Sequence, residues 1–362
     1  MNKPFNISDL DWPLLGLSLA ISLIGILEIY STTARTPLTH TWERQVFWVV
    51  MGCFLAILVG CIDYHLVLDQ ISWLYGLTVV GLAGLLIAGS RFGGARRWIH
   101  VGGFTLQVSE FAKLVIIILV AAELSHARTK CVTWWQLAKL GTLIAVPLLL
   151  IALEPDLGTA LTLLPIAFAG VFLVGIRARQ VGLIILLGVL ALPVAWRFLR
   201  PYQRQRLETF FHPAQNQRGA SYQLTETKIA IGSGGFWGKG LGNGTQSQLG
   251  FIPVSHADAI FAAYAEEEGF VGALVALALY GALLLRLLDA AQQAPDRAGA
   301  LVLVGLSALL FFQVAVNVGM MIGLFPITGI PLPLMSQGGS AVLSVFLGLG
   351  LAMSVKKQRF VN

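Results

Sequence analysis

Charged side chains are scarce in this chain of 362 residues, in which Asp, Glu, Lys and Arg together make up only 12%. Soluble globular domains carry about 25% of these residues. Hydrophobic residues make up 56%, the mean hydropathy is +0.78, and apolar runs approach the ~20 residues that a helix needs to cross a bilayer. The composition therefore excludes an ordinary soluble domain and predicts an all-α polytopic membrane protein.

Long polar stretches and cysteines are also missing. No polar segment is long enough for a separate soluble core, so residues 1–362 are expected to form one membrane domain. The three cysteines, Cys53, Cys61 and Cys131, all lie outside the longest polar segment, so no disulfide framework is implied. The first apolar run, "WPLLGLSLAISLIGILEIY", is too long for the core of a typical signal peptide and lacks a convincing cleavage site. It is therefore expected to be a retained span.

About ten apolar segments are predicted to span the membrane, and a polar segment over 198–258 separates the seventh from the eighth. An even number of spans places both termini on one side. Because Lys356, Lys357 and Arg359 follow the last span, the positive-inside rule makes that side cytoplasmic. The 198–258 segment is then a long extracytoplasmic loop. The ten expected spans are 13–30, 46–62, 71–89, 109–124, 137–153, 157–176, 181–197, 259–286, 299–324 and 335–354.

The expected extracytoplasmic loop is rich in glycine and basic residues, and a loop of roughly 60 residues in a compact protein usually has a function of its own. Glycine turns expose backbone N–H groups that can bind anions, and Arg204, Arg206 and Lys239 add positive charge. A flexible connector is the alternative. A nucleotide P-loop is excluded, because the pattern ending at Lys239 requires a glycine at 233 and a hydroxyl residue at 240, where the chain has Ser233 and Gly240.

One part of this loop, "SYQLTETKIAIG", predicts a short amphipathic helix that lies at the membrane interface. Tyr222, Leu224, Ile229 and Ile231 would form its apolar side. This position would bring Lys228 and the glycine run to the level of the lipid phosphates. An ordinary surface helix is the alternative.

Further charged residues lie near the starts of the fourth and sixth expected spans. Glu110 and Lys113 are three apart, so they share one helix face and are expected to form a structural ion pair inside the bundle. Asp156, in "EPDLGTA", either caps the next helix or lines a polar cavity. Arg96 and Arg97 precede the fourth span on the external side, where they could meet a phosphate or a lipid headgroup.

Asp258 differs from these residues because no lysine or arginine lies three or four positions away. It lies at the external mouth of the eighth span, where partial burial would raise the pKa of a carboxyl group, as a proton acceptor near neutral pH requires. A helix N-cap is the alternative. Glu266, with Glu267 and Glu268, lies about two turns deeper along the same helix and is expected to join a polar interior.

The blocks that carry these residues are "GARRW", "QVSEFAK", "EPDLGT", "YQRQR", "KIAIGSGG", "GKG", "GTQSQL", "HADAIFAAYAEEEG" and "PITGIPLPLMSQGGS". Together, and in this order, they resemble the SEDS family (shape, elongation, division and sporulation proteins), most closely its RodA branch. The resemblance runs from the first span to the last and includes the count of ten spans. Such blocks are far more specific than hydropathy.

The resemblance implies a peptidoglycan glycosyltransferase of the bacterial cytoplasmic membrane, with a role in cell elongation and rod shape. Its expected substrate is lipid II, the undecaprenyl-pyrophosphate-linked disaccharide-pentapeptide, which it would polymerise at the outer face of the membrane. The expected partner is a class B penicillin-binding protein, which cross-links the new glycan. Asp258 matches the essential aspartate of the family. Nucleic acid is not an expected partner.

Five positions depart from the pattern of the family. Ala257 and Ala259 stand where threonine and phenylalanine are usual, and Val108 stands where proline is usual. Glu154 replaces a common glutamine, and Gln337 replaces a common tyrosine. Since the essential aspartate is retained, the expected activity stands, and the departures at Ala257 and Ala259 bear on contacts to the acceptor.

The expected mechanism is an inverting transfer in which Asp258 accepts the proton of the acceptor's GlcNAc 4-hydroxyl as that oxygen attacks C1 of the donor's MurNAc. Undecaprenyl pyrophosphate leaves, and positive charge stabilises it. A divalent cation, Mg²⁺ or Mn²⁺, could share this task, although no metal-ligand spacing is visible. The expected substrate-binding residues are Arg96, Arg97, Arg204, Arg206, Lys239, Gln246 and His256.

Two other functions are compatible with ten spans and intramembrane charges. A transporter could move a lipid-linked precursor across the membrane, but no inverted repeat or pair of interrupted helices supports it. A non-catalytic scaffold could recruit cell-wall enzymes. The activated lipid would supply the energy for polymerisation, which agrees with the lack of a nucleotide motif.

Overall fold

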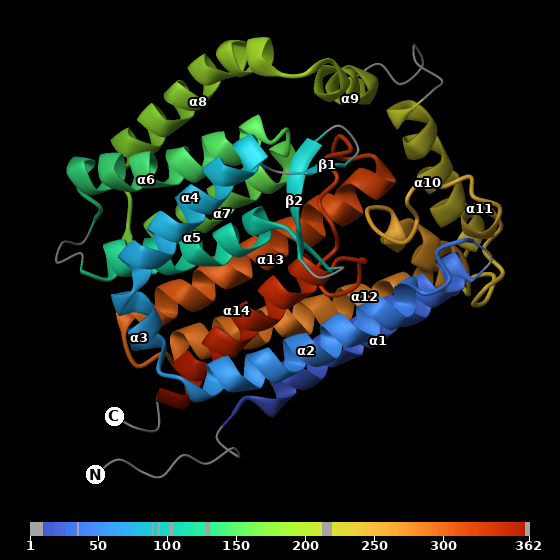
Figure 1. Ribbon diagram of the computed structural model, residues 1–362, viewed down its shortest axis with the longest axis horizontal. Helices are drawn as coiled ribbons and strands as arrows, with labels where there is room; N and C mark the ends of the chain where they lie inside the picture. Colours follow the sequence, from blue (N-terminus) through green and yellow to red (C-terminus); the bar gives the residue numbers. More distant parts are fainter. Residues whose placement is uncertain are drawn as a thin grey trace.

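The ten predicted spans all correspond to α-helices in a computed structural model that describes residues 10–358 apart from 35, 89, 93–94, 102–103, 127–130 and 212–218 (Figure 1). Seven of these helices are long and apolar enough to cross a membrane, and α4 and α8 have shorter apolar cores. The remaining helix, α5, carries three charged residues. The ten helices are α1 (Trp12–Thr33), α2 (Thr41–Cys61), α4 (Ile71–Ala88), α5 (Val108–Ser125), α6 (Trp134–Leu153), α7 (Leu157–Val174), α8 (Ala178–Phe198), α12 (Ile260–Gln292), α13 (Arg297–Ile322) and α14 (Gly339–Gln358).

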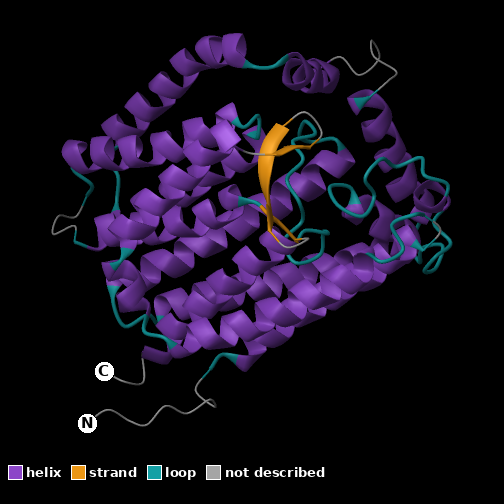
Figure 2. Cartoon of the chain, in the orientation of Figure 1, coloured by secondary structure: helices purple, strands orange, loops and turns teal. Residues whose placement is uncertain are grey.

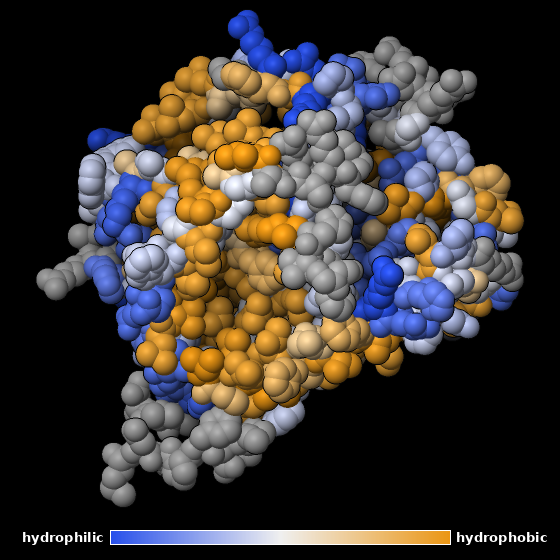
Figure 3. Space-filling model, viewed as in Figure 1, coloured by the Kyte–Doolittle hydropathy of each residue, from blue (hydrophilic) through white to orange (hydrophobic). Residues whose placement is uncertain are grey.

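Apolar side chains cover the middle of the molecule, and polar side chains gather toward its two ends (Figure 3). Large apolar residues on α2 and α4, among them Val50, Phe54, Trp73 and Leu77, are exposed. Such a belt matches a surface that faces lipid. The chain is therefore a multi-pass membrane protein.

The two ends of the bundle carry different elements. The start of α1, the end of α14 and the short helix α3 (Tyr64–Asp69) lie at one end, which we call the terminal end (Figure 1). The helices α9 (Pro201–Phe211), α10 (Ala220–Gly234) and α11 (Thr245–Gln248) lie at the opposite end, which we call the loop end. The described part of the 198–258 segment therefore contains three helices as well as irregular stretches.

Close approach between helices depends on small residues, as is usual where lipid replaces water around a bundle. The central helix α13 packs against α5, α7 and α12, and α2 packs along α14. A methyl group added to Gly350 of α14 would lie only 2.7 Å from the carbonyl oxygen of Ala56 in α2. The backbones of these two helices can therefore meet only because position 350 has no side chain.

Helix α8 stands apart from this packing. Together with α9 it arches over the other helices (Figure 1), and all described residues of α8 beyond Val181 are exposed. Its shorter apolar core, Ala178–Pro193, therefore faces lipid. Helix α9, which follows it, reaches back over the bundle and contributes to the cavity described below.

Helix α10 confirms the helix predicted from "SYQLTETKIAIG", but its apolar side was predicted wrongly in part. Leu224 is buried, whereas Tyr222 and Ile229 are exposed. The reason is that α10 packs on α12 through its small residues. Ala230 is fully buried, and a methyl group on Gly234 would lie 2.1 Å from a carbonyl oxygen of α12.

A small antiparallel sheet, absent from the all-α prediction, precedes α5 (Figure 2). Its strands, β1 (Ser90–Phe92), β2 (Ala95–Val101) and β3 (Phe104–Leu106), follow one another in order. The register pairs Ser90 with Trp98 and Ile99 with Leu106. Because β2 carries Arg97 and Trp98, the sheet places both residues at the cavity.

Candidate active site

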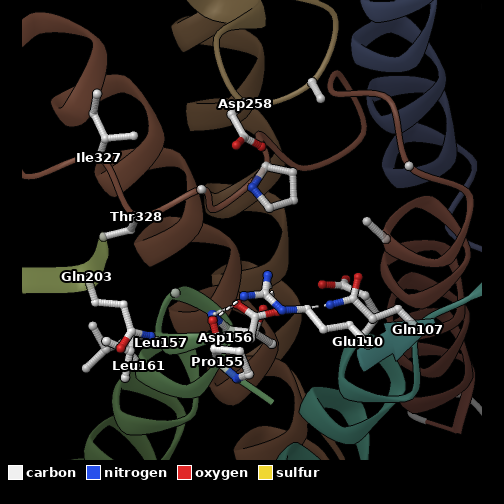
Figure 4. A pocket seen from close by; sticks show the side chains of 18 of the residues that line it. Gln107, Glu110, Pro155, Asp156, Leu157, Leu161, Gln203, Asp258, Ile327 and Thr328 are labelled. Carbon is white, nitrogen blue, oxygen red and sulfur yellow. Dashed lines mark hydrogen bonds and ion pairs between the residues drawn. The ribbon is translucent and has the colours of Figure 1, made fainter. Parts of the chain in front are cut away.

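A cavity of about 650 Å³ lies at the loop end, and residues from several distant segments line it (Figure 4). This volume falls within the range that small-molecule sites occupy. The segments are β2, the start of α5, the corner between α6 and α7, α9, the residues before α12, and the connection between α13 and α14 with the start of α14. The polar lining residues include Arg97, Gln107, Glu110, Asp156, Gln203, Arg206, Asp258 and Gln337.

Asp258 lines this cavity immediately before α12 (Figure 4). Ala259 is the N-cap of α12 and no side chain caps the helix, so the N-cap alternative for Asp258 is wrong. Asn317 of α13 holds the position of the backbone, since its Nδ2 donates to the carbonyl oxygens of Asp258 at 3.0 Å and Ile330 at 2.8 Å. Burial raises the pKa of Asp258 above its ordinary value, and the charge of Arg206 opposes this effect.

Arg206 of α9 is the cation that lies beside Asp258. Its Nη1 donates to the carbonyl oxygen of Ile327 at 3.3 Å, and its guanidinium lies 5.8 Å from the centroid of the Tyr202 ring. A methyl group on Gly329 would lie 3.3 Å from Asp258 Oδ2 and 3.7 Å from Arg206 Nη1. The carboxylate and the guanidinium therefore flank the same glycine, which has a φ of +76°.

Arg97 of β2 reaches the corner between α6 and α7. Its Nε donates to the carbonyl oxygen of Glu154 at 3.0 Å, and its Nη2 donates to that of Pro155. Its Nη1 lies 3.6 Å from Asp156 Oδ2. Arg97 therefore supplies a second positive charge to the cavity, whereas the side chain of Arg96 lies outside the described part of the structure.

Both interpretations of Asp156 hold in the structure. Its Oδ1 accepts from the backbone N of Thr159 at 3.2 Å, which caps α7. Its Oδ2 accepts from Gln107 Nε2 at 3.1 Å and pairs with Arg97 in the lining of the cavity. Asp156 thus links the start of α7 to the segment before α5.

The predicted ion pair between Glu110 and Lys113 is confirmed. Lys113 Nζ lies 2.8 Å from Glu110 Oε2, and both side chains are almost fully buried. Ser344 of α14 also donates to Glu110 Oε2 at 3.3 Å. The pair therefore ties α5 to α14 beneath the cavity, where Glu110 contributes to the lining.

Glu266 does not line the cavity and instead holds the glycine-rich segment 235–250, which we call the latch. Its carboxylate accepts from Lys239 Nζ at 2.7 Å and Thr245 Oγ1 at 3.1 Å. It also accepts from the backbone N of Gln246 at 2.9 Å and of Ser247 at 3.1 Å. The structure thus pairs Lys239 with Glu266 and does not bring it to the cavity.

Glu267 fastens the same latch to α1. Its Oε2 accepts from Ser31 Oγ at 2.6 Å and from the backbone N of Gly242 at 3.0 Å. A methyl group on Gly238, whose φ is +79°, would lie 2.1 Å from the carbonyl oxygen of Glu267. The glycines of the latch therefore permit close approach to α12, which breaks helical geometry at Gly269 to receive it.

Three other predicted substrate-binding residues lie outside the cavity lining among the described residues. Arg204 Nη2 donates to the carbonyl oxygen of Arg197 at 3.0 Å. The carbonyl oxygen of His256 accepts from the backbone N of Gln337 at 3.1 Å, and burial lowers the pKa of the His256 imidazole. Gln246 lies in the latch. Among the described basic residues predicted to bind substrate, Arg97 and Arg206 line the cavity, whereas Arg204 and Lys239 do not.

Sequence reasoning did not identify Asn317, Gly329 or Ser336. Ser336 Oγ donates to the carbonyl oxygen of Ala257 at 2.7 Å, so the segment "PITGIPLPLMSQGGS" supports the backbone around Asp258. The block contributes to the family resemblance, but the sequence alone assigns no role to its residues. An isolated asparagine in the apolar run over 299–324 was the available signal for Asn317.

Metal binding by protein ligands alone finds no support in the described residues, where no group of three or more His, Cys, Asp or Glu side chains could hold an ion. Magnesium commonly binds through one or two carboxylates together with substrate phosphates. A divalent cation bound in that way stays a prediction.

Known proteins are similar to this chain along nearly its whole length. The family model FtsW/RodA/SpoVE, described as cell cycle protein, matches residues 10–360. The peptidoglycan glycosyltransferase MrdB of Escherichia coli (strain K12) is 37% identical over 356 residues, which cover 97% of this chain and 94% of MrdB. The peptidoglycan glycosyltransferase RodA of Treponema pallidum (strain Nichols) is 30% identical over 428 residues, which cover 98% of this chain and 99% of that protein.

Solved structures show the same similarity. A chain of a peptidoglycan synthase complex that coordinates polymerization and crosslinking has a TM-score of 0.83 and 32% identity, with 98% of this chain and 99% of that chain covered. The rod shape determining protein RodA of Thermus thermophilus has a TM-score of 0.73 and 31% identity, with 98% of both chains covered.

Proposed function

Since this chain belongs to the FtsW/RodA/SpoVE family and is a peptidoglycan glycosyltransferase, we propose that Asp258 is the general base of its transfer reaction. One observation carries the proposal: the Asp258 carboxylate lines the cavity at the loop end, next to Arg206 across Gly329. Burial favours the protonated form of Asp258, so its carboxylate is a stronger base than an exposed one.

The proposed substrate is lipid II, and the proposed reaction is an inverting displacement at C1 of the donor's MurNAc. The GlcNAc 4-hydroxyl of the acceptor attacks C1 while Asp258 takes the hydroxyl proton. The bond between C1 and the pyrophosphate oxygen breaks, and undecaprenyl pyrophosphate leaves with the electron pair. The clamp of Asn317 on the backbone of Asp258 fixes the base for this step.

Arg206 and Arg97 are the proposed partners of the pyrophosphate. Both line the cavity, and fixed positive charge in a site shielded from water stabilises a developing anion. Arg206 has a second role, because its charge keeps the neighbouring Asp258 ionisable.

The proposed orientation places the loop end on the outer face of the bacterial cytoplasmic membrane and both termini in the cytoplasm. The basic residues Arg286, Arg297, Lys356 and Lys357 at the terminal end support it. The proposed partner is a class B penicillin-binding protein, since the similar chain in a solved synthase complex takes part in coordinating polymerization with crosslinking.

The test uses purified protein and lipid II, with Asp258→Ala as the variant and Asp69→Ala, an exposed aspartate at the terminal end, as the matched control. We expect the control to form glycan polymer at the wild-type rate and Asp258→Ala to form none, with unchanged thermal unfolding. Polymer made at the wild-type rate by Asp258→Ala would exclude the proposed base. Movement of lipid II across vesicle membranes without polymer formation would favour a transporter. The absence of both activities in the wild type would favour a scaffold.

A further inference from the structure

Glu154 is a buried acid next to the cavity to which the proposed mechanism gives no role. It follows α6 at the corner where the chain turns into α7, and only 1% of its surface is exposed. Within the described part of the chain, neither carboxylate oxygen has a hydrogen-bond partner. An ionised carboxylate without donors is costly to bury, so this corner accommodates the neutral acid.

Arg97 connects this corner to the cavity. Its guanidinium donates to the carbonyl oxygens of Glu154 and Pro155 and also lines the cavity, where it lies 3.6 Å from Asp156 Oδ2. The same cation therefore lines the cavity and binds the backbone of Glu154, and its charge acts on the Glu154 carboxyl group. A change in the charge of Glu154 would act on Arg97 as well as on the neighbouring Asp156, because no hydrogen-bond donor neutralises the Glu154 carboxyl group.

The other charged and titratable groups around the corner come from four elements. Asp156, at the start of α7, is the neighbouring anion, and Tyr202 of α9 donates its hydroxyl to the carbonyl oxygen of Pro155 at 2.7 Å. Burial and the charge of Asp156 raise the pKa of Glu154 to about 8, and Arg97 opposes them. The remaining groups of the cavity are Arg206 of α9, Asp258 before α12, and Glu110 with its partner Lys113 on α5.

We propose that Glu154 is a positioning residue that controls Arg97 through its own protonation. While Glu154 is a neutral acid, the guanidinium of Arg97 is available to pair with the pyrophosphate of the substrate in the cavity. When its O–H bond dissociates and the proton passes to solvent, the resulting carboxylate competes for Arg97 and withdraws the guanidinium from the substrate. The inference rests on the proposed function, in which Arg97 stabilises the pyrophosphate.

The test compares the pH dependence of kcat/KM for lipid II polymerisation in the wild type and in Glu154→Gln, which keeps the shape but cannot ionise. At pH 9, one unit above the pKa of about 8, we expect the wild-type value to be ~10-fold below its maximum. The Glu154→Gln value should fall less than ~2-fold over the same range. Superimposable alkaline limbs in the two proteins would overturn the proposal.

Two further variants test whether Glu154 acts through Arg97. Arg97→Gln should have a lower kcat/KM that no longer falls between pH 7 and pH 9, because the group that Glu154 controls is gone. A retained alkaline limb in Arg97→Gln would contradict the proposal. Glu123→Gln, which removes a surface carboxylate of α5 that pairs with Lys139, should keep the wild-type profile.

A second variant and a second measurement make the test independent of a folding defect in Glu154→Gln and of the role proposed for Asp258. Glu154→Leu also removes the ionisable group and replaces Glu154→Gln if that variant fails to fold. Infrared spectra of the wild type should show a protonated carboxyl band that disappears between pH 7 and pH 9 and is absent from the variant. No such difference would overturn the proposal, whereas an active Asp258→Ala would remove the proposed base and leave this comparison intact.

Discussion

Replacing Glu154 with glutamine should stabilise the protein, and the gain should grow with pH. The pKa of Glu154 is about 8 in the folded protein, and its ordinary value is 4.5. The unfolded chain therefore releases this proton above pH 4.5, whereas the folded chain keeps it until about pH 8. Since the folded state binds more protons in this window, the free energy of unfolding of the wild type falls as pH rises through it.

Each unit of difference in pKa corresponds to ~1.36 kcal/mol. Relative to a residue that does not ionise, the wild type should thus lose at most ~3 kcal/mol by pH 7 and ~5 kcal/mol above pH 8. Glutamine carries no such loss. For a protein of this size, the larger figure corresponds to a difference in Tm on the order of 5 °C.

The assay is thermal unfolding in detergent from pH 5 to pH 9 for the wild type, Glu154→Gln and the surface control Glu123→Gln. The Tm difference between Glu154→Gln and the wild type should be small at pH 5, rise up to pH 8 and then stay level. The control should differ from the wild type by less than ~1 kcal/mol at every pH, because surface ion pairs contribute little. A difference for Glu154→Gln that does not change with pH would refute the reasoning.

Three further predictions concern the cavity and its supports. Gly329→Ala should lower the polymerisation rate by ~10-fold or more with little change in Tm, because its methyl group would lie 3.3 Å from Asp258 Oδ2 and displace that carboxylate, at a φ of +76° that favours glycine. An unchanged rate would contradict this close contact. Lys113→Met should lower the unfolding free energy by ~3 kcal/mol or more in thermal unfolding, since it leaves Glu110 buried without its partner, and the double variant with Glu110→Gln should recover most of the loss. Lys239→Met should speed proteolysis of the latch while Glu266 stays in place, and cleavage at the wild-type rate would show that the ion pair does not hold this segment.

The positions of the ten spanning helices along the chain were largely predictable because lipid imposes a strong pattern on the sequence. An apolar run of about 20 residues satisfies its backbone only as a helix when it spans a bilayer, so hydropathy located all ten helices. The sheet before α5 was missed although its strands are separated by Gly93-Gly94 and Gly102-Gly103, a combination typical of hairpins. Strands of three to seven residues give too little alternation to stand out beside such helices.

The candidate site was predictable only in part. Asp258 stood out because it lacked a local partner, and the close spacing of Glu110 and Lys113 was enough to predict their ion pair. Lys239 could not be placed from the sequence, because its partner Glu266 lies 27 positions away and is reached through the fold. Asn317 was missed for the same reason, since it contacts the backbone of residue 258 from another helix.

The role of Asp258 as proton acceptor is tested by the rate of glycan polymerisation in Asp258→Asn, because asparagine keeps the size of the side chain but cannot take up the proton. General base catalysis contributes roughly 10²- to 10⁴-fold. We therefore expect kcat to fall by at least ~10²-fold while binding of lipid II and Tm stay close to those of the wild type. A kcat for Asp258→Asn within a few-fold of the wild-type value would contradict the assignment of Asp258 as the base.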